Sequence, residues 1–142
     1  MDQAAVQELI KRCELFHGLV PEDVMKIFAK GMTMRVAKGE PIFYKGTIGG
    51  QMYVVLAGTV GVYDNNKVIA TLHTGDMFGE MALVNKEPRS ATVLALEDAR
   101  LYVLSESTFE KLMTKRVAIQ MLFNIIRTLS HRLKESNVRK ME

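Results

Sequence analysis

The spacing of apolar residues changes its period twice along this chain, and no other feature restricts the possible fold as much. Apolar residues recur at helical spacing up to Gly31, alternate with a period of two from Met32, and return to helical spacing after Ser105. Side chains repeat every 3.6 residues on a helix and every two on a strand. The pattern therefore predicts an α+β fold, with helices before and after a β unit, and argues against alternating βαβ units.

Two helices are predicted in the N-terminal segment, residues 1–31. The first covers residues 3–15 and ends at His17-Gly18, and the second begins at Pro21 and ends at Gly31. The apolar side chains expected to face inward are Val6, Leu9, Ile10, Cys13, Leu15 and Phe16 in the first helix, and Val24, Ile27 and Phe28 in the second.

Seven or eight short strands are predicted between residues 32 and 104. The runs rich in Val, Ile and Tyr cover residues 34–36, 41–44, 52–57, 59–63, 68–72, 90–96 and 100–104. Turn sequences such as Gly49-Gly50 and Asp64-Asn65-Asn66 separate them. Short strands at roughly even spacing are typical of a sandwich or jelly roll.

The segment 105–142 is predicted to be helical. Ser105 and Ser107 can cap a helix whose inward-facing residues are Phe109, Leu112 and Met113. Farther along, apolar residues at spacings of four, three and four form a narrow seam: Leu122, Ile126, Leu129 and Leu133. Such a seam is typical of a helix that pairs with another helix, with packing against the chain's own strands as the alternative for its earlier half.

The length and composition indicate one soluble domain. The chain has 142 residues, of which 48% are hydrophobic, which is enough to form a core without disulfides or a structural metal. Its single cysteine, Cys13, indicates a reducing compartment, and we expect a cytoplasmic protein. No run of about 20 apolar residues predicts a membrane span, and the N-terminus lacks the pattern of a secretory signal.

Positive charge is concentrated in the C-terminal segment. The net charge is +3, but residues 111–142 hold eight basic residues against two acidic ones, Glu135 and Glu142. A basic segment can bind nucleic acid or an acidic partner, and it can equally be the solvated face of a helix. The second interpretation is favoured here, because no element that could read a DNA groove is evident.

Residues 78–92 interrupt the strand pattern with a different kind of sequence. Gly79 allows close approach of a ligand, and residues 80–85 can form a short helix whose N-terminal end suits an anion. Arg89 can donate two hydrogen bonds to a phosphate, and a carboxylate such as Glu80 can accept hydrogen bonds from sugar hydroxyls. Together these groups point to a small ligand with a phosphate and a ribose. The alternative is a plain salt bridge between Glu80 and Arg89 across a turn.

The string FGEMALVNKEPRSATV, which begins at Phe78, resembles the phosphate-binding cassette of the cyclic nucleotide-binding domain family. The resemblance extends to Lys45-Gly46, to residues 58–62, to Gly75-Asp76 and to the helices after the strands. It implies one domain over residues 1–142: N-terminal helices (1–31), an eight-stranded antiparallel β-barrel or jelly roll (32–104) that contains the cassette (78–92), and C-terminal lid or dimerisation helices (105–142).

The resemblance also implies a role for individual residues. Glu80 would accept the ribose 2′-hydroxyl, Arg89 would bind the cyclic phosphate, and Ser90 would add a hydroxyl. Residues at the end of the long helix would reach the base, unless they form only a polar helix end. The full set of predicted ligand-binding residues is Val62, Leu72, Phe78, Gly79, Glu80, Met81, Ala82, Leu83, Arg89, Ser90, Ala91, Ser136 and Asn137.

The sequence departs from the family pattern at one position that bears on the arginine. Many members have an acidic residue that orients this arginine, whereas this chain has Gly49-Gly50-Gln51, so Arg89 is expected to be held more loosely. Ser90 occurs in binders of either nucleotide and does not select the base.

The expected function is a regulatory sensor that binds cyclic AMP in preference to cyclic GMP and repacks its C-terminal helices. The resemblance implies a homodimer formed through residues 117–137, and the effector is unknown: either a separate protein reads the signal or this chain is a fragment of a longer protein. No cofactor, no metal and no membrane are expected. Enzymatic activity is not expected, because His17, His73 and His131 lie in three distant segments. The alternative is a degenerate module of the same fold that only dimerises.

Overall fold

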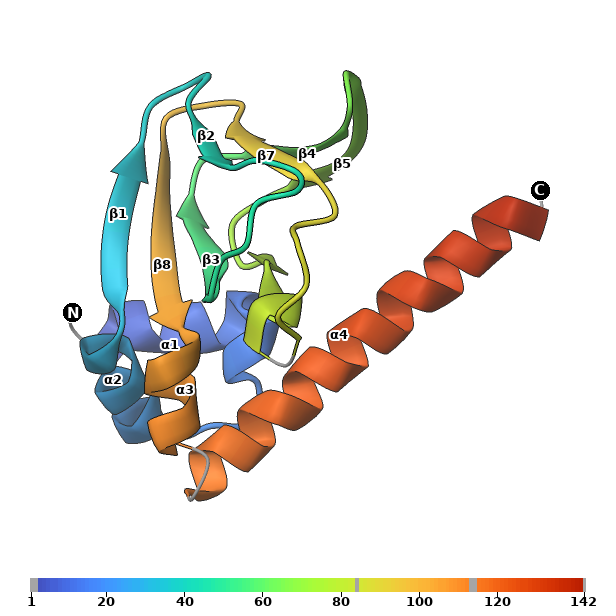
Figure 1. Cartoon of the computed structure of the whole chain (residues 1–142). Coiled ribbons are helices and arrows are strands. Elements are labelled where there is room, and N and C mark those ends of the chain that lie inside the picture. The colour runs from blue at the N-terminus through green and yellow to red at the C-terminus, as the bar shows by residue number, and fades with distance from the viewer. Residues whose placement is uncertain (1–2, 84, 113–114, 142) are drawn as a thin grey trace.

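The computed structural model describes residues 3–83, 85–112 and 115–141, and it has helices before and after the strands, as predicted (Figure 1). In chain order the elements are α1 (Gln3–Arg12), η1 (Glu14–Phe16), α2 (Pro21–Lys30), β1 (Met32–Val36), β2 (Pro41–Phe43), β3 (Gln51–Ala57), β4 (Val60–Asp64), β5 (Lys67–Leu72), β6 (Met77–Phe78), η2 (Glu80–Leu83), β7 (Thr92–Ala95), β8 (Ala99–Ser105), α3 (Glu106–Leu112) and α4 (Arg116–Met141).

The strands form two four-stranded antiparallel sheets, which confirms the predicted jelly-roll class. One sheet has the order β1-β8-β3-β6 and the other β2-β7-β4-β5. In the first sheet β3 and β8 pair over most of their length, with Tyr53 opposite Val103 and Val54 opposite Tyr102. Consecutive residues of both strands are buried, because one face packs on the second sheet and the other on the helices.

Tyr102 lies at the centre of the contact between the first sheet and the helices. Its ring stacks on Phe28 at a centroid distance of 4.9 Å, and its hydroxyl donates a 2.9 Å hydrogen bond to the Ile27 carbonyl. Burial raises the pKa of this hydroxyl. A Cβ at Gly31 would lie 2.4 Å from the Tyr102 ring, so only glycine allows the chain to turn from α2 into β1 here.

Several boundaries differ from those predicted. The first helix ends at Arg12, and an extended Cys13 separates it from the 3-10 turn η1, whose Leu15 and Phe16 are buried. The predicted helix 80–85 is the shorter 3-10 helix η2. The two-residue strand β6 was not predicted, because two residues are too few to show a period. The predicted inward positions Val6 and Met113 lie outside the described side chains.

Helix α4 divides the predicted seam between two faces. Leu122 and Leu129 pack on the chain's own core, whereas Ile126 and Leu133 are exposed. Two more exposed apolar residues, Ile119 and Phe123, extend that outer face. The earlier half of the helix therefore packs on the domain, while an apolar stripe of Ile119, Phe123, Ile126 and Leu133 remains on its surface.

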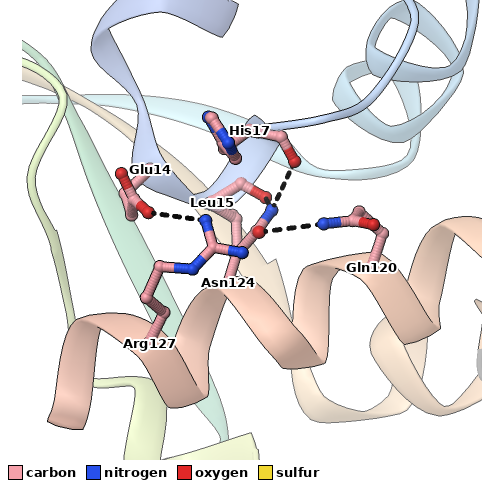
Figure 2. A network of polar contacts seen from close by, with 6 residues as sticks. All are labelled: Glu14, Leu15, His17, Gln120, Asn124 and Arg127. Atoms are coloured by element: carbon pink, nitrogen blue, oxygen red, sulfur yellow. Dashed lines mark hydrogen bonds and ion pairs between the residues drawn. The ribbon is translucent and has the colours of Figure 1, made fainter.

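A buried asparagine attaches α4 to the N-terminal segment (Figure 2). Asn124 is 0% exposed, and its amide nitrogen donates to the carbonyls of Leu15 at 2.8 Å and His17 at 2.9 Å. Its side-chain oxygen accepts a 3.2 Å bond from Gln120 Nε2. Arg127 and Glu14 form an exposed ion pair of 3.4 Å beside this network. The contacts fix the first part of α4 against η1.

Among the described residues, no helix combines the length and the apolar character needed to cross a membrane.

Candidate functional site

A cavity of about 450 Å³ opens between the second sheet, η2 and helix α4. Ten of the residues predicted to bind a ligand line it: Val62, Leu72, Phe78, Gly79, Glu80, Met81, Ala82, Arg89, Ser90 and Ala91. The cavity is also lined by residues that were not predicted: Phe43, Ala70, Asn85, Glu87, Pro88, Val93 and Arg132. Its size lies within the ordinary range of small-molecule sites.

The Arg89 guanidinium is half-buried at one side of the cavity and is held by backbone carbonyls. Its Nη2 donates to the Gln51 carbonyl at 2.7 Å, and its Nη1 donates to the Gly79 carbonyl at 3.2 Å. The guanidinium carbon lies 4.1 Å from the centre of the Phe43 ring. Two carbonyls and an aromatic face therefore orient Arg89. These contacts hold the arginine in place although residues 49–51 include no acidic residue.

The remaining guanidinium nitrogen, Nε, has no partner among the residues that the structure describes. Nε of Arg89 is buried and has no hydrogen-bond acceptor among the described residues. Burial lowers the pKa of Arg89, an effect opposed by the nearby Tyr53 and Glu80. An unpaired buried donor on a permanently charged group is costly, and an anion in the cavity would relieve that cost.

Gly79 makes room for this arginine. Its φ of +73° lies in the left-handed region, and a Cβ at this position would lie 2.9 Å from Arg89 Nη1 and 3.2 Å from the Gln51 carbonyl oxygen. A side chain here would displace either the guanidinium or the strand that supports it. The glycine of the cassette is therefore required by both backbone conformation and space.

Glu80 is buried within the cavity wall and is paired with a residue from α4. Its exposed fraction is 5%, and its Oε1 accepts a 2.8 Å hydrogen bond from Arg132 Nη1. Arg132 also donates through Nη2 to the Met77 carbonyl at 2.7 Å. The simple Glu80–Arg89 salt bridge considered from the sequence is therefore not the arrangement observed. A carboxylate that uses one oxygen for Arg132 can still accept a hydrogen bond on the other.

Three predicted site residues do not line the cavity. Leu83 is buried in the core between the first sheet and the helices. Ser136 and Asn137 are exposed toward the C-terminal end of α4. Their predicted contact with the base stays a prediction.

Arg132 is the main charged residue of the cavity that sequence reasoning did not single out. It lies on α4, and its partner Glu80 is 52 residues earlier. The available signal was the buried carboxylate itself, since a buried Glu needs a cation or several donors. Phe43 was also missed, because its contact with Arg89 depends on how β2 packs on β7.

Aromatic side chains form the wall behind Arg89. The rings of Tyr53 and Phe78 stack at 5.0 Å, and Phe43 lies 6.0 Å from Phe78. The Tyr53 hydroxyl donates to Gln51 Oε1 at 3.1 Å, and burial raises its pKa. The site therefore offers a cation, a buried carboxylate and apolar walls. No group of three or more potential metal-ligating side chains occurs within residues 3–83, 85–112 and 115–141.

Comparison with known proteins agrees with this geometry. The model of the cyclic nucleotide-binding domain matches residues 33–116. The cyclic AMP receptor protein of Thermus thermophilus is 31% identical over 134 residues, which cover 91% of this chain and 61% of that protein. The type II regulatory subunit of the cAMP-dependent protein kinase of Drosophila melanogaster is 32% identical over 113 residues, which cover 80% of this chain and 30% of that subunit. The chain thus spans less than two thirds of the length of both relatives.

Solved structures show the same architecture. The Thermus thermophilus catabolite activator protein superposes with a TM-score of 0.79 at 32% identity, over 89% of this chain and 61% of that one. A cyclic nucleotide-binding domain from Methylobacillus flagellatus has the same fold, with a TM-score of 0.84 at 23% identity, over 96% of this chain and 80% of that one. This chain belongs to the cyclic nucleotide-binding domain family.

Proposed function

We propose that this chain is a regulatory sensor that binds cyclic AMP in preference to cyclic GMP. One cavity holds both Arg89, whose buried Nε has no acceptor among the described residues, and the buried carboxylate of Glu80, and this observation carries the proposal. The first suits a cyclic phosphate and the second suits a ribose hydroxyl. The preference for cyclic AMP rests on the names of the relatives, a cyclic AMP receptor protein and a cAMP-dependent kinase subunit.

The proposed ligand contacts follow from this layout. Arg89 would bind the phosphate, with Ser90 beside it, and Glu80 would accept the 2′-hydroxyl on the oxygen that Arg132 leaves free. Apolar positions on β4 and β5, Val62 and Leu72, would pack beside the sugar and base. The backbone of residues 79–82 would line the sugar-phosphate.

We further propose that α4 transmits the binding event. Arg132 connects this helix to the wall of the cavity, and Asn124 holds the preceding turns of the helix against η1. A ligand that binds Glu80 beside Arg132 would therefore act on the part of α4 beyond Arg127, and repacking would begin there. Ser136 and Asn137 lie in that part and could then reach the base.

The protein is proposed to act as a homodimer through residues 117–137, in one cytoplasmic domain with no enzymatic activity of its own. The exposed apolar stripe on α4 supports such pairing, since a second copy would cover it. A separate effector would read the change.

Thermal melting with cyclic AMP and cyclic GMP tests the proposal. A ligand that binds only the folded state adds about 2.7 kcal/mol of stability at 100 times its Kd. Arg89→Ala should weaken binding roughly 10- to 100-fold, because the phosphate loses a charged hydrogen-bond donor. The matched control is Arg100→Ala, an exposed arginine on β8.

The control should bind as the unaltered chain does. If millimolar concentrations of either nucleotide leave the melting temperature unchanged, the sensor hypothesis is wrong, and the degenerate dimerisation module becomes the better interpretation. A larger shift with cyclic GMP than with cyclic AMP would contradict the proposed preference alone.

A further inference from the structure

A second cavity, of about 500 Å³, lies between α2 and the start of α4, away from the nucleotide cavity. Four basic residues line it: Lys26, Lys30, Lys115 and Arg116. Its apolar lining includes Ile27, Leu112 and Val117, and Asp23 is the one acidic residue among the described residues that line it. Figure 1 shows α2, α3 and the beginning of α4 together at the same end of the molecule. We call this cavity the basic groove.

Ion pairs within the chain leave most of this charge unbalanced. Lys26 lies 3.5 Å from Glu22, but both side chains are highly exposed, so the pair neutralises little. In the part of the chain that the structure describes, no carboxylate lies within 4.0 Å of the charged nitrogens of Lys30, Lys115 or Arg116. The groove therefore presents a net positive charge to solvent.

The stability of the chain's own helices does not account for all four residues. Lys30 lies in the last turn of α2, where a cation interacts favourably with the helix dipole. Arg116 begins α4, Lys115 immediately precedes it, and the first turn of that helix has no acidic residue. Cations at a helix N-terminus are unfavourable, so these two residues cost the isolated domain some stability.

The shape and lining of the groove select among anionic partners. Ile27 and Leu112 are each 2% exposed and form a recessed apolar floor beneath the cations. A flat bilayer surface does not reach a recessed floor, whereas a single peptide side chain can enter it. Single-stranded nucleic acid binds to aromatic platforms, and the lining of this groove has no aromatic residue among those described.

We propose that the basic groove binds an acidic segment of a partner protein, with carboxylates on its rim and one large aliphatic side chain on its floor. Charge complementarity supplies the rim contacts, and burial of the aliphatic group supplies specificity for a peptide over a free anion. Because the groove joins α2 to the first residues of α4, a partner bound there contacts the base of the helix that we propose to transmit nucleotide binding.

The probe is a fluorescein-labelled 12-residue peptide of Glu and Asp with Leu at two positions four residues apart, titrated with the full chain by fluorescence anisotropy. We expect saturable binding that weakens as salt is added. The variant Lys30→Glu/Arg116→Glu should bind at least tenfold more weakly. The matched control, Lys38→Glu/Lys67→Glu, makes the same change of net charge at exposed positions outside the groove and should bind as the unaltered chain does. Unchanged circular dichroism and a cooperative melting transition would verify that both variants fold.

Two further peptides test the two halves of the proposal separately. Replacing Glu and Asp by Gln should abolish binding, and replacing both Leu by Ala should weaken it. The proposal is wrong if the peptide does not bind at about 1 mM protein, or if both double variants weaken it equally. It is also wrong if vesicles containing phosphatidylserine bind through Lys30 and Arg116 while the peptide does not. Nucleotide binding plays no part in these outcomes.

Discussion

At the scale of single residues, the site depends on two arginines that are attached in different ways. Arg89 is fixed by carbonyls of β3 and the cassette and keeps one buried donor unpaired, while Arg132 reaches across from α4 to neutralise Glu80. The sequence located Glu80 and Arg89, because both belong to one continuous segment. It did not indicate Arg132, because that pairing depends on how a distant helix crosses the sheet.

Replacing Arg132 tests its contact with Glu80. Arg132→Ala leaves a nearly buried carboxylate without its cation, so we expect a loss of about 1–2 kcal/mol in the free energy of unfolding at pH 7. Urea denaturation measures this loss of stability. The control is Arg127→Ala, whose exposed pair with Glu14 should contribute less than about 1 kcal/mol. Equal losses in the two variants would mean that the contact of Arg132 with Glu80 stabilises the fold no more than the exposed pair of Arg127 and Glu14.

The buried thiol of Cys13 gives the stability a dependence on alkaline pH. Burial, reinforced by Asp76, raises the pKa of this thiol from 9.0 to about 12. Below pH 9 the thiol is protonated in both folded and unfolded states, so its contribution is constant. Between pH 9 and 12 the unfolded chain loses the proton while the folded chain retains it, and the free energy of unfolding should fall by up to about 1.4 kcal/mol per pH unit.

Urea denaturation from pH 8 to 11 measures this dependence. Tyr53 and Tyr102 also have raised pKa values and add a decrease of the same sign above pH 10, so the comparison must be made with Cys13→Ala. That variant should lose less stability than the unaltered chain between pH 9 and 10. Parallel curves for the two proteins would contradict the assignment.

At the scale of elements, the order of helices and strands was predictable, but their ends were not. Runs rich in Val, Ile and Tyr between turn sequences identified the long strands β3, β4, β5 and β8, and the helical period identified the long helix α4. The brief elements β6, η1 and η2 are defined by hydrogen bonds to distant segments and by turn geometry. The predicted seam of α4 was divided for a similar reason, because only the packed domain determines which of its residues face the core.

The attachment of α4 to η1 can be tested at Asn124. Asn124→Ala removes the donor shared by the carbonyls of Leu15 and His17 and leaves a small void. The free energy of unfolding should therefore fall by about 2–3 kcal/mol. Hydrogen exchange should increase in residues 14–17 and 116–126, with the two sheets remaining protected. Asn137→Ala, an exposed position on the same helix, should change stability by less than about 0.5 kcal/mol. If exchange in 14–17 does not change, Asn124 is not the attachment.

At the scale of the whole molecule, the chain buries one core between its sheets and another between the first sheet and the helices, and carries an exposed apolar stripe on α4. The class of the fold followed from the sequence because the two changes of period mark where the layers begin and end. The position of the apolar stripe did not follow from the sequence, because the stripe consists of the α4 residues that stay exposed once the inner face of the helix has packed on the domain.

That stripe predicts the oligomeric state. Sedimentation should show a dimer of twice the 16.0 kDa chain mass, and Phe123→Glu should yield the monomer, because it places a charge at the centre of the stripe. Ile69→Glu alters another exposed apolar position, on β5, and should leave the dimer intact. A monomeric unaltered chain would contradict dimerisation through α4.

The contact between Asn124 and η1 also defines a point about which the rest of α4 can pivot. Helix α4 continues from Asn124 to Met141, a length of about 25 Å at 1.5 Å per residue, and its end stands away from both sheets (Figure 1). A tilt of roughly 10° about the Asn124 attachment would displace that end by about 4 Å, more than the distance that joins Arg132 to Glu80. If ligand binding tilts α4 as proposed, a change at the cavity wall would become a displacement of this size at the end of the helix, where a partner protein would detect it.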